Sequence, residues 1–85
     1  MIDVPDVPGE VMRLRQRWIE DNGPRRPEVV YLPPSHAEVL LLVYLDRADD
    51  EERERLTGQG VEAVYGGMIY GMEIRRTDDL VPRVE

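Results

Sequence analysis

The sequence predicts a small α+β domain in which a helix, a strand, a second helix and two further strands follow one another around a short sheet. The chain has 85 residues, of which 41% are hydrophobic, enough for one core and too few for two. Apolar residues recur at helical spacing near the N-terminus, and two apolar runs bounded by glycines lie near the C-terminus. We therefore treat residues 1–85 as a single domain, with residues 1–8 as an extended arm and residues 9–85 as the globular α+β part.

The first expected elements are the arm and a helix. Residues 1–8 intersperse proline and aspartate with valine, which is typical of an extended segment that adds to a sheet or to a neighbouring molecule. Residues 9–21 have an apolar stripe at helical spacing, formed by Val11, Leu14 and Trp18 with Met12 and Ile19 beside it. A Gly-Pro pair at 23–24 is a helix stop signal, so this helix is expected to end before it.

A short strand and a second helix are expected next. Residues 28–32 have the composition of a strand, and a Pro-Pro pair ends it. Ser35 and Glu38 then have the spacing of a capping box, in which each side chain accepts a hydrogen bond from the other residue's backbone amide. The apolar run at 39–45 would also suit a buried strand, but the cap and the prolines favour a buried helix over residues 35–45. Replacing Ser35 by Ala should then cost about 0.5 to 2 kcal/mol.

The remaining segments are expected to be a short charged helix and two strands. Residues 46–56 have acidic residues before basic ones, the order that suits a helix dipole, so one or two solvated helical turns should end at residues 57–58. Residues 60–67 and 68–77 resemble two strands, between which the glycine pair at 66–67 either turns or bulges the chain. Gly71 either weakens the second strand or marks a close backbone approach. A turn at 77–79 and a short tail should follow.

Charge and composition exclude several classes of function. Eighteen acidic and 11 basic residues give a net charge of -7, which repels nucleic acid and anionic lipid and favours basic or neutral protein partners. Without cysteine there is no disulfide, no thiolate nucleophile and no cysteine-based zinc site. The longest apolar run has seven residues, far short of the roughly 20 that span a bilayer, and no signal peptide is evident. We therefore expect no membrane association, and a location in the cytoplasm or in a particle assembled there.

No motif indicates catalysis, a cofactor or a metal site. His36 is the single histidine and has no ligand cluster near it, so we interpret it as a solvated residue in a first helical turn. The carboxylates at 46–51 lack the glycine and the alternating oxygen ligands of a calcium loop, which favours a solvated acidic face. The Gly-x-Gly-x-x-Ala spacing at 58–63 follows a helix and not a strand, so it predicts no nucleotide site.

Arginines at 13–26 surround Trp18, a combination that can bind single-stranded nucleic acid, and Pro24 and Pro27 form a minimal Pro-x-x-Pro. Neighbouring carboxylates favour a salt-bridged surface instead, and nucleic acid is not an expected partner.

The second helix predicts association with another protein chain. A helix that is apolar on every side must be covered all round, and the first helix and a short sheet cover only two sides. The remaining side should meet another molecule, most simply a copy of the same chain about a twofold axis. The residues expected to make this contact are Leu41, Leu42, Tyr44, Leu45 and Trp18.

Four segments follow one another in a recognisable order: Val29-Val30-Tyr31-Leu32, the capped run at 35–45, Ile69-Tyr70-Gly71-Met72-Glu73-Ile74 and the turn ending in Leu80-Val81-Pro82. In this order they resemble the C-terminal part of the tailed-bacteriophage major capsid protein family. Members of that family are several times longer, and Glu73 stands where they tend to have proline or an apolar residue. The resemblance implies a small capsid-like structural or accessory protein of the virion and names no catalytic residue.

Two functions from different classes remain open. The first is a non-enzymatic structural or assembly protein, such as a phage particle component, that acts as a homo-oligomer or within a larger assembly. The alternative is a small acidic inhibitor or adaptor that binds a basic surface of a host protein, for which the net charge and residues 46–54 are the motivation. An enzyme is the third class, and no group of residues supports it.

Overall fold

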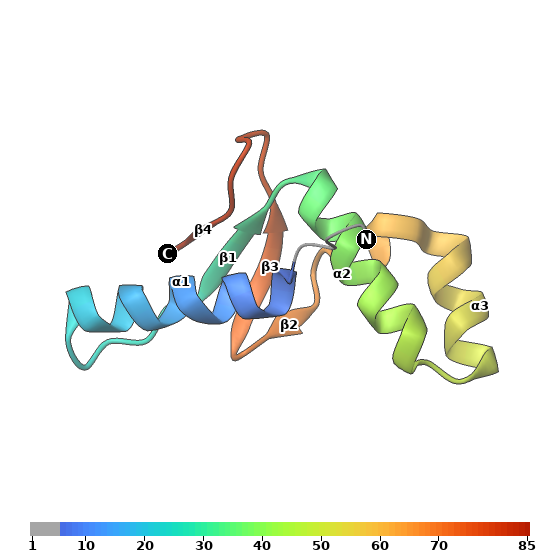
Figure 1. Ribbon diagram of the computed structural model, residues 1–85, viewed down its shortest axis with the longest axis horizontal. Coiled ribbons are helices and arrows are strands. Elements are labelled where there is room, and N and C mark those ends of the chain that lie inside the picture. The colour runs from blue at the N-terminus through green and yellow to red at the C-terminus, as the bar shows by residue number, and fades with distance from the viewer. Residues whose placement is uncertain (1–5) are drawn as a thin grey trace.

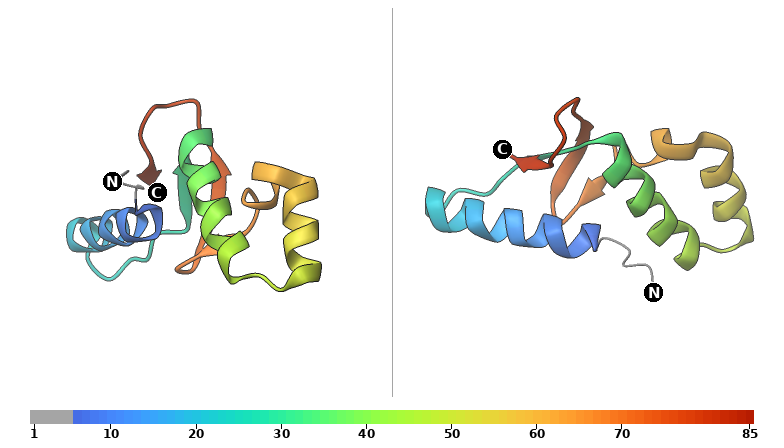
Figure 2. Two further views of the ribbon diagram at one scale, coloured as in Figure 1. Left: turned by 45° about the vertical axis from the view of Figure 1, so that its right-hand side comes forward. Right: turned by 45° about the horizontal axis from the view of Figure 1, so that its top comes forward.

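The computed structural model describes residues 6–85 and confirms the α+β fold, with three α-helices and a 3-10 helix beside a four-stranded mixed sheet (Figure 1). Both α1 and α2 lie on one face of the sheet, and α3 lies beyond α2 (Figure 2). In chain order the elements are α1 (Val7–Asn22), β1 (Val29–Leu32), α2 (Pro34–Arg47), α3 (Asp50–Gln59), η1 (Gly60–Ala63), β2 (Met68–Ile69), β3 (Met72–Arg76) and β4 (Arg83–Val84).

The sheet has the strand order β2-β3-β1-β4, and its central pair, β1 and β3, is parallel. Val30 stands opposite Ile74 in this pair, and the outer strands β2 and β4 are both antiparallel to their neighbours. A parallel pair needs a crossover connection, because the chain must return to the starting edge before the second strand can begin. Here α2, α3 and η1 together form that crossover.

The core lies between the two central strands and the helices α1 and α2. Alternate residues of β1 and β3 point into it, so Val30 and Ile74 are buried whereas Tyr31 and Glu73 lie on the opposite face. The fully buried hydrophobic residues are Val7, Val11, Val30, Leu32, Ala37, Leu40, Val64, Met72 and Ile74.

Helix α1 confirms the predicted first helix but begins earlier than expected. Asp6 caps it by accepting a hydrogen bond from the backbone amide of Gly9 at 3.1 Å, and Pro8 lies in the first turn. The predicted extended arm at 1–8 is therefore wrong for Val7 and Pro8, because proline fits a first helical turn, where its missing amide hydrogen loses no partner. The rest of the predicted arm, up to residue 5, lies outside the described residues.

Helix α2 confirms the predicted second helix, but the capping box is wrong. The helix begins at Pro34, with Pro33 as its N-cap and no side chain capping it. Proline at the first helical position has the backbone angle that the helix needs, so the start moves ahead of Ser35 and leaves the serine inside the first turn. The Ser35 hydroxyl lies 3.4 Å from Nδ1 of His36 instead.

The charged segment forms a longer helix than expected, and a 3-10 helix replaces the strand predicted at 60–67. Asp49 caps α3 by accepting from the Glu52 amide at 2.8 Å, and Gly60 ends the helix with a positive φ of 63°. The four residues of η1 then continue as a tighter helix. The strand prediction is wrong because η1 packs on α2 and places Val64, the residue that follows it, in the core. A strand in the sheet would not pack on α2 in this way.

The strand predicted at 68–77 is a hairpin. Tyr70 and Gly71 both have positive φ, 50° and 81°, as in the two-residue turns that match the twist of a β-hairpin. Gly71 is thus a turn residue and not a weak point within a strand.

The segment predicted as a tail forms β4, beside β1. The Glu85 amide donates to the Val29 carbonyl at 2.8 Å, which fixes the end of the segment to the sheet.

The two candidate caps give a direct stability test. Asp49→Ala should cost about 1 kcal/mol, because it removes the hydrogen bond to the α3 amide. Ser35→Ala should cost less than about 0.5 kcal/mol, because the hydroxyl caps nothing. Urea unfolding of both variants measures the difference, and an equal loss in the two would contradict the assignment of the α2 start.

A second test compares two leucines two positions apart on α2. Leu40 is fully buried, whereas Leu42 is 60% exposed. Leu40→Ala should lower the free energy of unfolding by about 2 to 5 kcal/mol, enough to unfold much of a small domain. Leu42→Ala should change it by no more than about 0.5 kcal/mol. Chemical denaturation followed by circular dichroism gives both values, and similar losses would show that α2 is rotated from its position here.

Candidate functional site

The structure divides the five residues predicted to make a protein contact between two places. Leu41 and Tyr44 pack against the core, and Leu45 is half-buried, so only Leu42 of the α2 residues is largely exposed. The reason is that α3 and η1 cover a side of α2 that the sequence left open. Trp18 lies on α1, in a groove beside β4 that none of the four α2 residues lines.

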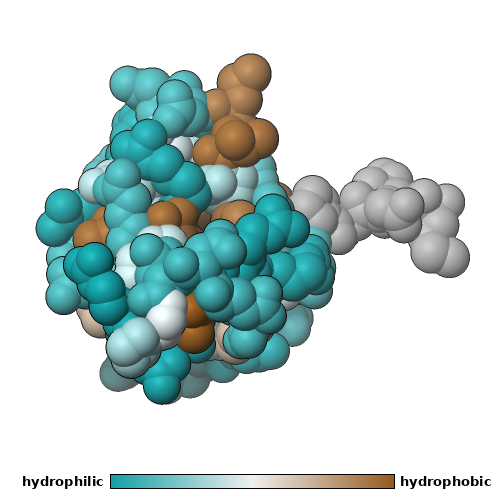
Figure 3. All heavy atoms as spheres, turned by 90° about the vertical axis from the view of Figure 1, so that its left-hand side faces the viewer, coloured by the Kyte–Doolittle hydropathy of each residue, from teal (hydrophilic) through white to brown (hydrophobic). Residues whose placement is uncertain are grey.

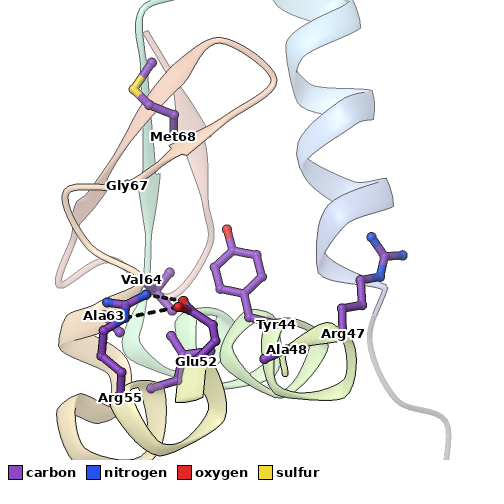
Figure 4. Close-up of a pocket in the computed structure, with 10 residues that line it drawn as sticks. Tyr44, Arg47, Ala48, Glu52, Arg55, Ala63, Val64, Gly67 and Met68 are labelled. Carbon is purple, nitrogen blue, oxygen red and sulfur yellow. Dashed lines mark hydrogen bonds and ion pairs between the residues drawn. The ribbon is translucent and has the colours of Figure 1, made fainter. Parts of the chain in front are cut away.

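A hollow of about 450 Å³ lies between α2, α3, η1 and the start of β2 (Figure 4). Figure 4 shows Tyr44 pointing from α2 toward the hairpin, and Arg55 and Glu52 of α3 facing each other as an ion pair. Burial, and next the neighbouring Tyr70, raise the pKa of the Tyr44 phenol, so this group stays neutral at physiological pH. The Tyr44 phenol is thus protonated, and Glu52 and Arg55 neutralise each other. None of these three side chains is an acid or base that titrates near physiological pH.

His36 is half-buried and lies where α2 contacts α1, which corrects its interpretation as a solvated residue. Its Nε2 lies 3.4 Å from Oε2 of Glu10 on α1. The ring also lines a small apolar hollow with Val7 and Val39. Residues 6–85 contain no group of three histidine or carboxylate side chains placed to hold a metal ion.

The sheet face opposite the helices has polar side chains that pair with one another. Arg75 donates from Nε to Oε1 of Glu73 at 3.0 Å, and this hydrogen bond lowers the pKa of the Glu73 carboxyl. The guanidinium of Arg83 stacks over the Tyr31 ring, 4.6 Å from its centroid. No helix within residues 6–85 covers this face, and its charged side chains pair with one another: Arg75 with Glu73, and Arg83 with Glu85.

The largest exposure of apolar side chains among the described residues lies on the loop between β3 and β4. Leu80 is 90% exposed and its neighbour Val81 is 68% exposed. We call these two residues the apolar tip. The loop stands above the sheet in Figure 1, and a brown group of hydrophobic atoms projects at the same height in Figure 3.

Contacts on both sides of the apolar tip hold the loop in this shape. The Thr77 amide donates to the Leu32 carbonyl at 3.2 Å, and the Thr77 hydroxyl accepts from the Asp79 amide at 3.2 Å. Arg83 then donates to the Asp79 carboxylate at 3.3 Å, while Pro82 is buried. The loop is thus fastened before and after Leu80, and its two apolar side chains are directed away from the core.

A groove of about 200 Å³ lies beside the loop, between α1 and β4. Its apolar lining comes from Leu14 and Trp18 of α1 and from Pro82 and Val84 at the sheet edge, and Arg17, Asp21 and Arg83 line it as well. We call it the Trp18 groove. Trp18 also lines a second hollow with Arg25 and Arg26. Residues 13–26 contain five arginines and two carboxylates, so this end of α1 is positive in an otherwise acidic chain.

Sequence reasoning selected Trp18 but missed the apolar tip. The signal was present, since Leu80 and Val81 follow two aspartates and precede a proline, where no apolar periodicity assigns them to a core. We interpreted them as part of a tail, and only the pairing of β4 with β1 makes the segment before it a fastened loop.

Comparison of the chain with family models, with curated proteins and with solved structures finds no match. Among residues 6–85, no helix has the length and hydrophobicity needed to cross a membrane.

The position of the apolar tip predicts that it is dispensable for folding. Leu80→Asp should change the free energy of unfolding by no more than about 0.5 kcal/mol, because the side chain contributes little to the core. Val84→Asp is the matched control, since Val84 packs against the core and a buried charge there should cost several kcal/mol. Denaturation at low protein concentration separates folding from association, and a large loss for Leu80→Asp would place this residue in the core.

Proposed function

We propose that this chain is a non-enzymatic structural or assembly protein that acts through self-association. The observation that supports it is the apolar tip, two adjacent apolar side chains that a fastened loop holds out in solvent. Exposure of these side chains to water is unfavourable, and their burial against another surface would contribute favourable hydrophobic free energy to binding. A loop stiffened by its own hydrogen bonds also loses little conformational entropy on binding.

The hollows of the molecule favour association over catalysis. Two of the three charged side chains that line the α2–α3 hollow, Glu52 and Arg55, pair with each other, and the third is Arg47. The pKa of Tyr44 is raised, whereas an acid-base catalyst needs a pKa near the working pH. The Trp18 groove is lined by apolar and charged side chains together, and protein interfaces combine the two in the same way. These features support a surface that binds protein.

The setting of this association is part of the proposal. The resemblance of residues 28–82 to the C-terminal part of phage major capsid proteins supports a component of a phage-type particle. A chain without cysteine suits the reducing cytoplasm, or a particle assembled there. The apolar tip falls at the Leu80-Val81-Pro82 end of the resembling segment.

A second candidate function rests on the other end of the molecule. The first turn of α3 contains Asp50, Glu51 and Glu52, and this helix lies at the opposite end of the long axis from the arginines that follow α1 (Figure 1). An acidic end of this kind is suited to binding a basic surface of another protein, as an inhibitor or adaptor would. This alternative requires no contact between copies of the chain.

The mass in solution tests the proposed function. The chain has a mass of 9.8 kDa, and light scattering over a range of concentrations should give an average mass that rises above this value as the concentration increases. A mass that stays at that of one chain up to the highest reachable concentration would reject self-association. The acidic adaptor would then be the better candidate, and a basic protein such as a histone would serve as its first binding probe.

A further inference from the structure

We infer that two copies associate about a twofold axis by reciprocal insertion, the apolar tip of each lying in the Trp18 groove of the other. This inference rests on the proposed self-association and specifies its surface. It places the contact at the β4 edge of the sheet and not on α2, where Leu42 is the only large hydrophobic side chain that is widely exposed.

The tip and the groove are neighbours on the same side of the molecule. Pro82 directly follows the tip in the chain and also lines the groove, so little more than one residue separates the two surfaces. A twofold contact requires one patch that is complementary to itself. An axis that passes between the tip and the groove would bring each tip to the partner's groove at the same time.

The two surfaces also match in chemistry. The aliphatic side chains of Leu80 and Val81 suit a groove floored by Leu14 and the Trp18 ring. Asp78, next to the tip, makes no ion pair with any of residues 6–85 and is exposed. The linings of the groove and of the adjoining hollow contain three exposed arginines that make no ion pair within residues 6–85, Arg17, Arg25 and Arg26. Two carboxylates, Asp21 and Glu28, stand among them, and Glu85 is paired with Arg83. Asp78 would therefore meet an excess of positive charge.

The tip does not occupy the groove of its own chain. Leu80 is 90% exposed although the groove begins only two residues further along. The hydrogen bond from the Asp79 amide to Thr77 and the pair between Asp79 and Arg83 hold the loop in its outward shape. The tip of a second copy is therefore free to fill the groove.

A charge exchange between two variants tests this contact. Asp78→Arg makes both the tip and the groove basic, and the double change Arg17→Glu with Arg25→Glu makes both acidic. Each variant alone should self-associate about tenfold more weakly than the wild type, or worse, because like charges then face each other in both contacts. An equimolar mixture should form heterodimers at wild-type strength, because both contacts regain opposite charges. Native mass spectrometry separates the two variants by mass and counts the species.

Asp50→Arg, at the far end on α3, is the matched control and should leave association unchanged. Leu80→Asp should weaken association while its circular dichroism spectrum stays that of the folded wild type. This variant tests the same contact if one of the charge variants does not fold. If the wild type associates but the charge variants associate equally well and show no preference for each other, the tip-in-groove contact is wrong and self-association occurs through another surface. A wild type that stays monomeric rejects both this contact and the proposed function.

Discussion

The parallel pairing of β1 with β3 is the constraint on which the rest of the structure depends. Two parallel strands cannot be joined by a tight turn, so the chain must leave the sheet and return. That excursion contains α2, α3 and η1, and the apolar faces of α2 and of the strand pair bury each other. Helix α1 then covers the remaining part of the same layer through Val7 and Val11. Among residues 6–85, no helix lies against the opposite face of the sheet.

Local signals predicted the helices well because each depends on residues close together in sequence. The Gly23-Pro24 stop gives the end of α1 to within one residue. Of the predicted apolar stripe only Val11 is fully buried, and Met12 is exposed. The same kind of reasoning placed α2 correctly but misassigned its cap, because two start signals overlap and Pro34 precedes Ser35. The backbone angle of Pro34 decides between these two start signals, and residue composition alone does not show which of them prevails.

The sheet was harder to predict because its pairings are non-local. Nothing near residues 60–67 indicates that Val64 belongs to a core formed by β1, β3 and α2, so an apolar run between glycines resembled a strand. The same limit applied to the candidate site. Trp18 could be selected as an aromatic residue among arginines. The apolar tip could not, because its loop is held in place only when β4 pairs with a strand more than 50 residues earlier.

Strand β4 has a consequence for the solubility of the molecule. It is only two residues long, yet it pairs with β1, whose sequence Val-Val-Tyr-Leu is uncharged and has high β-propensity. Without β4, the backbone groups of β1 would form an open sheet edge able to recruit strands from other molecules without limit. Strand β4 therefore covers the backbone of β1 and replaces its longer edge with an edge of two residues.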